Sequence, residues 1–120
     1  MWHYLLMENS KWPTEWLRGA LTAAVLSIVS EEETYGYLVA QRLREGGLGV
    51  VKGGTLYPLL TRLEQDGDVI ASWREGAGGP GRKYYSITPA GKQRLALLRV
   101  DWKIFADHAT AVISGKQEHS

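Results

Sequence analysis

The sequence contains no cysteine, and among its 120 residues it has only one phenylalanine, two methionines and four prolines. The absence of cysteine excludes disulfides and cysteine-based metal or redox sites, and it suits a reducing cytoplasm. No apolar run approaches the roughly 18–20 residues of a membrane span. Residues 1–7 have neither a basic lead-in nor a small-residue cleavage site, so we expect no signal peptide. These absences predict a cytoplasmic protein without a membrane segment.

Length and composition favour one small folded domain with an appended helix or arm. Apolar residues make up 44% of the chain, a share too high for a disordered protein. At 120 residues the chain is too short for a large two-domain catalytic architecture.

The net charge of +1 conceals an uneven distribution. Residues 52–99 hold eight Lys/Arg against four Asp/Glu, whereas residues 1–51 hold four against six and residues 100–120 hold two against three. This basic middle segment predicts a face for an acidic partner, although an ordinary mixed surface explains the charge equally well.

Apolar periodicity predicts two helices in the first half of the chain. The first follows Pro13 and covers about residues 14–30. The second is capped by Thr34 and ends at two glycines, residues 46–47. Gly36, near its first turn, would let another backbone approach closely. The apolar stripe of this second helix comprises Tyr35, Leu38, Val39 and Leu43.

A third helix is predicted to begin near Thr55 and to end at Gly67. Pro58 would fall in its first turn, where the backbone amide has no partner within the helix. The core face of this helix has spacings of i, i+3, i+4 and i+7, and it consists of Leu56, Leu59, Leu60 and Leu63.

The next segment predicts a β-hairpin followed by a long helix. Residues 69–74 and 82–88 have strand composition and flank a glycine-rich loop at 76–81. This loop matches G-x-G-x-x-G, but a dinucleotide site needs a helix after the motif, and here a strand follows. Thr88 and Pro89 then begin a helix that runs to about Ser114.

The last helix carries an apolar seam with spacings of three and four residues, typical of a helix that packs along another helix. The simpler interpretation of Trp102 and Phe105 is packing in a dimer interface. Alternatively, two Trp102 side chains across a two-fold axis could hold a planar ligand. The predicted dimer interface comprises Leu95, Leu98, Trp102, Phe105, Ala109 and Val112.

Three helices followed by a basic, glycine-rich hairpin predict a winged helix–turn–helix, with the third helix in the DNA major groove. Hydroxyls, a guanidinium and an apolar edge on its outer face suit base edges and phosphates. Arg82 and Lys83 follow the hairpin loop directly, where cations neutralise a phosphate backbone. The predicted DNA contacts are Tyr35, Lys52, Thr55, Tyr57, Pro58, Thr61, Arg62, Arg82 and Lys83.

We find no residue set that predicts an enzyme, a metal site or a cofactor. His3 and His119 lie near the termini and His108 is isolated, so no two histidines have a metal-binding spacing. The acidic residues 31–33 fit a solvated turn better than an acid/base pair.

Several segments together resemble the PadR family of bacterial transcriptional regulators. They are residues 17–29, 34–37, 53–67 (GGTLYPLLTRLEQDG) and 81–91 (GRKYYSITPAG). The G-T-L-Y-P-x-L-x-R-L-E-x-x-G run is far more specific than a generic winged-helix pattern.

The resemblance implies a homodimeric repressor that leaves its operator when an effector binds. It implies Tyr57 and Pro58 at the exposed start of the recognition helix, wing contacts by Arg82 and Lys83, and a dimerisation role for the last helix. A single helix after the wing resembles the short subfamily. Some members of that subfamily bind planar hydrophobic compounds at the dimer centre, where Trp102 and Phe105 would lie.

The predicted fold class is therefore mainly α with a small β-hairpin (α+β). The domains would be an N-terminal arm (1–12), a winged helix–turn–helix (13–88), a dimerisation helix (89–116) and a tail (117–120). The partners would be double-stranded DNA, a second copy of the chain and a planar aromatic effector. A winged-helix module that binds only proteins remains the alternative.

Overall fold

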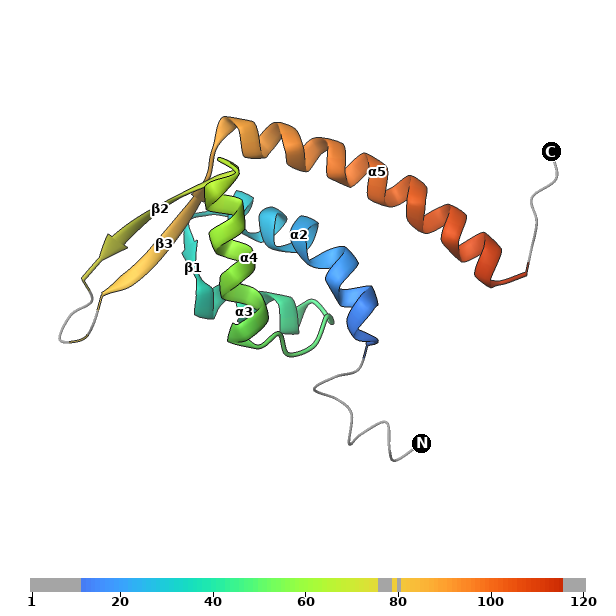
Figure 1. The fold of residues 1–120 in the computed structure, drawn as a ribbon, viewed down its shortest axis with the longest axis horizontal. Helices are drawn as coiled ribbons and strands as arrows, with labels where there is room; N and C mark the ends of the chain where they lie inside the picture. The colour runs from blue at the N-terminus through green and yellow to red at the C-terminus, as the bar shows by residue number, and fades with distance from the viewer. Residues whose placement is uncertain (1–11, 76–78, 80, 116–120) are drawn as a thin grey trace, which may run out of the picture.

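A computed structural model describes residues 12–75, 79 and 81–115. Over these residues the chain forms four helices and a three-stranded antiparallel sheet, which confirms the predicted fold class (Figure 1). The elements in order are α2 (Thr14–Glu31), β1 (Thr34–Tyr35), α3 (Gly36–Glu45), α4 (Gly53–Gln65), β2 (Val69–Arg74), β3 (Arg82–Ile87) and α5 (Pro89–Ile113). No helix within these ranges is long and apolar enough to span a membrane.

The core lies where α2, α3 and α4 meet. The four leucines of the α4 stripe are all buried, as their helical spacing predicts. They pack with apolar side chains from α2 and α3, with Val51 before α4, and with one fully buried residue each from β2, β3 and α5. The outer side of α4 stays in solvent, as in a helix–turn–helix.

Helix α4 begins two residues earlier than the sequence predicts, at Gly53. Pro58 is therefore the sixth residue of the helix rather than part of its first turn, and its position as predicted is wrong. Its ring faces the carbonyl of Gly54, four residues earlier, which lacks an intrahelical donor. Gly54 and Pro58 are both exposed, so water can hydrate that carbonyl.

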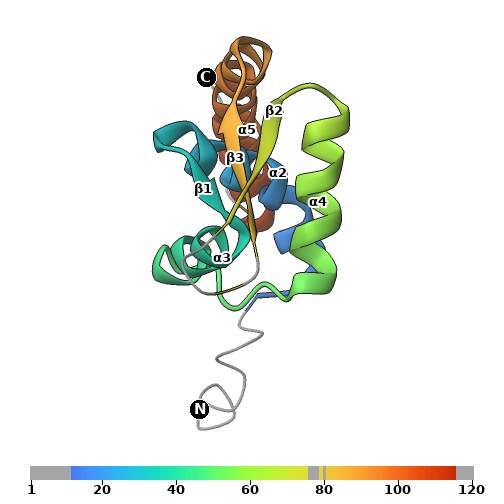
Figure 2. The ribbon, with the colours of Figure 1, turned by 90° about the vertical axis from the view of Figure 1, so that its left-hand side faces the viewer.

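The sheet contains a strand that the sequence reasoning missed. Thr34 and Tyr35 form β1, which pairs with Tyr85 and Tyr84 of β3, so the strand order is β1-β3-β2. Thr34 consequently does not cap α3, and Tyr35 precedes that helix instead of lying on its apolar stripe. Figure 2 shows the β2–β3 hairpin between α4 on one side and α3 with β1 on the other.

The hairpin itself is confirmed. Val69 pairs with Ile87 at its base and Arg74 with Arg82 at its far end. Most of the predicted glycine loop (76–78 and 80) lies outside the described residues, as do residues 1–11 of the predicted arm and the predicted tail.

Close contacts of Thr88, Gly91 and Asp68, called here the α5 joint, fix where α5 leaves the sheet. The Thr88 side chain accepts a hydrogen bond from the Gly91 amide at 3.0 Å, which confirms the predicted cap. A Cβ on Gly91 would lie 2.1 Å from the carbonyl oxygen of Asp68, so only glycine fits there. The buried carboxylate of Asp68 is paired with Arg94. From this joint α5 extends well past the other helices (Figure 1).

The seam of α5 divides into an inner and an outer part. Leu95 is only 3% exposed and belongs to the chain's own core, and Leu98 packs against that core. The assignment of Leu95 to the dimer interface is therefore wrong, because the first turns of α5 pack on their own domain. Further along, Trp102, Phe105 and Val112 are exposed.

Candidate nucleic-acid interface

The exposed side of α4 has a centre and two flanks. Each residue turns the helix by about 100°, so Pro58 and Thr61 lie roughly opposite the leucine stripe. Tyr57 and Arg62 are five residues apart, which places them about 140° apart on opposite flanks. The predicted DNA contacts on α4 therefore face three directions.

The flank of Tyr57 faces the hairpin across a groove of about 530 Å³. This groove, called here the wing groove, brings together Tyr35, Tyr57, Arg82 and Lys83, which lie in three separate segments of the chain. Its lining comprises Tyr35, Gly36, Tyr37, Tyr57, Trp73, Gly81, Arg82 and Lys83.

The guanidinium of Arg82 is held on the ring of Tyr35. Its central carbon lies 4.6 Å from the ring centroid, and Nη1 donates to the Tyr35 hydroxyl at 3.2 Å. Tyr35 is positioned in turn by β1 pairing and by an edge contact with Tyr84 at 5.2 Å between ring centroids. A cation–π contact of this kind pre-orients a charge that remains exposed. Tyr35 therefore positions Arg82 at the mouth of the groove.

The ammonium of Lys83 is paired within the chain. Its Nζ lies 3.0 Å from Oε1 of Glu64 on α4, and this hydrogen bond raises the pKa of Lys83 above its ordinary value. A phosphate that binds Lys83 must therefore compete with a carboxylate. Arg82 has no such competitor among the described residues and is the better phosphate ligand of the two.

The ring of Tyr57 packs against a glycine. A Cβ on Gly36 would lie 2.5 Å from both Cε1 and Oη of Tyr57, so the ring lies directly against the backbone of α3. The close approach predicted at Gly36 is present, but the side chain of Tyr57 makes it instead of another backbone. Tyr57 keeps 50% of its surface exposed.

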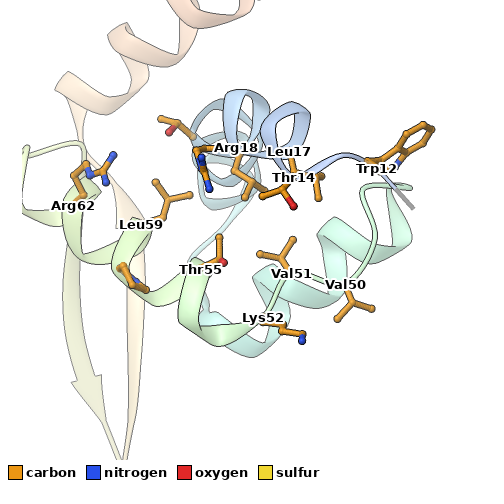
Figure 3. A pocket seen from close by; sticks show the side chains of 13 residues that line it. Trp12, Thr14, Leu17, Arg18, Val50, Val51, Lys52, Thr55, Leu59 and Arg62 are labelled. Carbon is orange, nitrogen blue, oxygen red and sulfur yellow. The ribbon is translucent and has the colours of Figure 1, made fainter. Parts of the chain in front are cut away.

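The remaining predicted contacts lie on the other side of α4. Lys52, Thr55, Pro58 and Arg62 line a second groove of about 410 Å³, between α4, α2 and the segment before α4 (Figure 3). Thr61 lines neither groove and is exposed. The nine predicted residues thus surround α4 instead of forming one cluster.

Two exposed side chains at this surface were not predicted. Trp73 is 71% exposed and lines the wing groove. Because side chains alternate along a strand, Trp73 lies on the same face of β2 as Val69 and Ala71. This alternation could have identified Trp73 as an exposed aromatic residue on the core-facing side of the strand, past the end of the core. Arg18 of α2 lines the second groove, but nothing in its local pattern distinguishes it from an ordinary surface arginine.

A third groove, of about 530 Å³, separates the first turns of α2 from the outer part of α5. It is lined mainly by apolar side chains, among them the predicted ligand pair Trp102 and Phe105, whose ring centroids are 5.8 Å apart. Trp12 and Trp16 face the same space, with ring centroids 6.5 Å apart. Ala109 also lines this aromatic groove.

The described residues contain no cluster of side chains that could hold a metal ion. His108 is an exposed residue of α5, and the other two histidines fall outside the described ranges.

The fold and the exposed recognition helix define a winged-helix DNA-binding regulator. Residues 25–97 match the model of the transcriptional regulator PadR-like family. The chain belongs to this family, which consists of transcriptional regulators and not of enzymes.

Individual relatives agree with this assignment. A Mycobacterium tuberculosis transcriptional regulator is 35% identical over 106 residues, 88% of this chain and 94% of that protein. The crystal structure of a PadR family transcriptional regulator from Eggerthella lenta has a TM-score of 0.75 at 34% identity, covering 82% of this chain and 86% of that one. A PadR-like regulator from Bacillus cereus has a TM-score of 0.73 at 31% identity, covering 86% and 100%.

Proposed function

We propose that the chain is a homodimeric transcriptional repressor whose α4 enters the major groove of a pseudo-palindromic operator. The observation that carries this proposal is the wing groove, where Tyr57 of the recognition helix and Arg82 of the hairpin face one space. Tyr57 can contact base edges, while Arg82 neutralises a backbone phosphate beside the same groove. Such a regulator works where the chromosome lies, in the cytoplasm.

Apolar surface on α5 supports dimerisation. Trp102, Phe105 and Val112 are 43%, 61% and 79% exposed, which leaves the outer seam without a partner in one chain. A second stripe on another face of α5 exposes Leu97, Val100 and Ile104. Exposed apolar stripes of this kind mark protein interfaces. A second copy of the chain would pack along the outer seam, and contact with successive major grooves requires its α4 to lie about 34–36 Å from the first, one DNA turn.

The aromatic groove is the proposed effector site. Four aromatic side chains and few polar groups suit a planar apolar compound. Because the groove lies beside the outer seam of α5, a bound compound would change how two copies pack. The domain boundaries follow from this division: a DNA-binding part at 13–88 and a dimerisation helix at 89–116, with residues 1–12 and 117–120 outside both.

The DNA-binding proposal is tested by selecting operators from a random duplex library with the purified protein, followed by gel shifts. We expect an enriched motif with two inverted half-sites, bound more tightly than a scrambled duplex. No shift with a folded protein at low salt would favour the protein-binding alternative.

The dimer is tested by sedimentation equilibrium. Phe105→Asp should dissociate it, whereas Ile70→Asp, on β2 at a similar exposed fraction (64% against 61%), should leave the mass unchanged. A dimer that survives Phe105→Asp would contradict the role of the outer seam.

The effector site is tested by fluorescence quenching with a set of planar aromatic compounds, measured together with operator release. Quenching should weaken in Trp102→Phe. Quenching that persists undiminished when Trp12, Trp16 and Trp102 are all replaced by Phe would place the site elsewhere.

A further inference from the structure

The groove between α4 and α2, called here the second groove, has a basic rim that the wing does not explain. Arg18 comes from α2, Lys52 from the segment before α4, and Arg62 from the C-terminal half of α4. Figure 3 shows Arg18 reaching from α2 toward α4 across this space. Thr14 and Thr55 add hydroxyl groups to the rim, and the floor is formed by leucines and valines. The groove therefore has an apolar floor and a cationic rim.

These cations have no anionic partner within the described part of the chain. None of the ion pairs among the described residues includes Arg18, Lys52 or Arg62. No acidic side chain lines the second groove. By contrast, Lys83, Arg42 and Arg74 each have a carboxylate partner. The positive potential of this rim is therefore available to a ligand.

The spacing of the rim suits an extended anion. Lys52, which directly precedes α4, and Arg62 are ten residues apart, which corresponds to about 15 Å along the helix axis at 1.5 Å per residue. One DNA strand carries a charge about every 3.4 Å along the helix axis, so it offers several phosphates over that length.

The placement of the two grooves matches the two strands that border a major groove. A helix with its side chains is about 10–12 Å across and fills a major groove of about 12 Å, so one strand lies along each flank. The wing groove serves the flank of Tyr57, and the second groove serves the flank of Arg62, about 140° away.

We propose that Arg18, together with Lys52 and Arg62, binds the backbone of the DNA strand opposite to the one held by the wing. This inference rests on the proposed function and adds α2 to the DNA-binding surface. Because phosphate contacts carry no sequence information, Arg18 sets affinity and helix position, while the exposed face of α4 sets specificity.

The first test measures the salt dependence of binding to a random-sequence duplex of about 30 base pairs, for which no operator is required. The slope of log K against log salt is negative, and each lost phosphate contact reduces its magnitude by about 0.9. The ratio of wild-type to Arg18→Gln affinity for DNA should therefore fall by about 3.5-fold per protomer between roughly 50 and 200 mM salt. Lys103→Gln on α5 removes the same charge from a side chain that is 75% exposed, and it should leave the slope unchanged.

Arg82→Gln serves as the internal standard. If Arg82→Gln lowers the slope and Arg18→Gln does not, the second-groove proposal is wrong while the proposed function stands. If the wild-type protein binds no duplex at low salt, the proposed function itself fails.

The second test locates the strand. Single phosphates of the selected operator are replaced by neutral methylphosphonates, one position at a time. Some replacements should weaken DNA binding by the wild-type protein but not by Arg18→Gln, and we expect these positions on one strand. The replacements that weaken binding by the wild-type protein but not by Arg82→Gln should lie on the other strand of the same half-site. Both sets on one strand would overturn the proposal, as would saturable binding of inorganic phosphate that is lost in Arg18→Gln without a change in DNA slope.

Discussion

The contact between Gly36 and Tyr57 allows recognition to be perturbed with little change in the fold. A Cβ at Gly36 would lie 2.5 Å from the Tyr57 ring, whereas ordinary contact begins at 3.4 Å, so Gly36→Ala must displace the ring by about 0.9 Å. Gly36 has no positive φ, so its backbone accepts alanine. Because Tyr57 is half exposed, its ring can turn toward solvent at a cost of about 0.5–1.5 kcal/mol.

We therefore expect a small loss of unfolding free energy and a large loss of discrimination. A displaced base-contacting side chain lowers the ratio of operator to random-duplex affinity by about 1–3 kcal/mol, or about 5- to 150-fold. Urea unfolding measures the first quantity, and competition gel shifts measure the second. Gly19→Ala in α2 is the matched control, since nothing lies within 4 Å of its added Cβ.

A double-mutant cycle decides whether Tyr57 carries the effect. In the Tyr57→Ala background the clash is absent, so Gly36→Ala should change discrimination no further. An equal loss with and without the Tyr57 ring would refute the reasoning, as would unchanged discrimination in Gly36→Ala alone.

Three further predictions concern the fold. Gly91→Ala forces a Cβ against the backbone oxygen of Asp68 and should lower the free energy of unfolding by about 3 kcal/mol, measured by urea unfolding. A urea midpoint equal to that of the wild type would contradict the close contact between Gly91 and Asp68. Leu95→Ala should cost about 2–5 kcal/mol of fold stability, while Val112→Ala should weaken only the dimer in sedimentation. Burial raises the pKa of Tyr85, so the unfolded chain ionises first as pH rises, and stability falls above about pH 10. Tyr85→Phe should flatten that decline, and an unchanged slope would show that another group causes it.

Local pattern was sufficient to predict much of the fold. The leucine spacing of α4 and the cap at Thr88 depend on neighbours within one or two turns, so the sequence carries them directly. The hairpin was predicted for the same reason, because its two strands are close in the chain.

Contacts between distant segments could not be predicted in this way. Strand β1 has two residues and exists only because β3, about fifty residues later, pairs with it. The heptad spacing of α5 predicts an apolar seam but not its partner, so Leu95 was placed in the dimer although it packs on its own domain.

The predicted DNA contacts show the same limit. Residue types on α4 and in the wing predicted one DNA-binding surface, whereas the fold divides these residues between two grooves. The Glu64 partner of Lys83 and the approach of Arg18 to α4 both join segments that no local pattern relates.

Dimethyl sulfate footprinting of the selected operator tests the central claim most directly, because the reagent methylates guanine N7 in the major groove and adenine N3 in the minor groove. Insertion of α4 into the major groove predicts guanine N7 protection in two segments about 10–10.5 base pairs apart, centre to centre, one for each recognition helix. It also predicts that Tyr57→Ala weakens this protection. Protection confined to adenine N3, or no protection of guanine N7 under conditions where the duplex is bound, would contradict it.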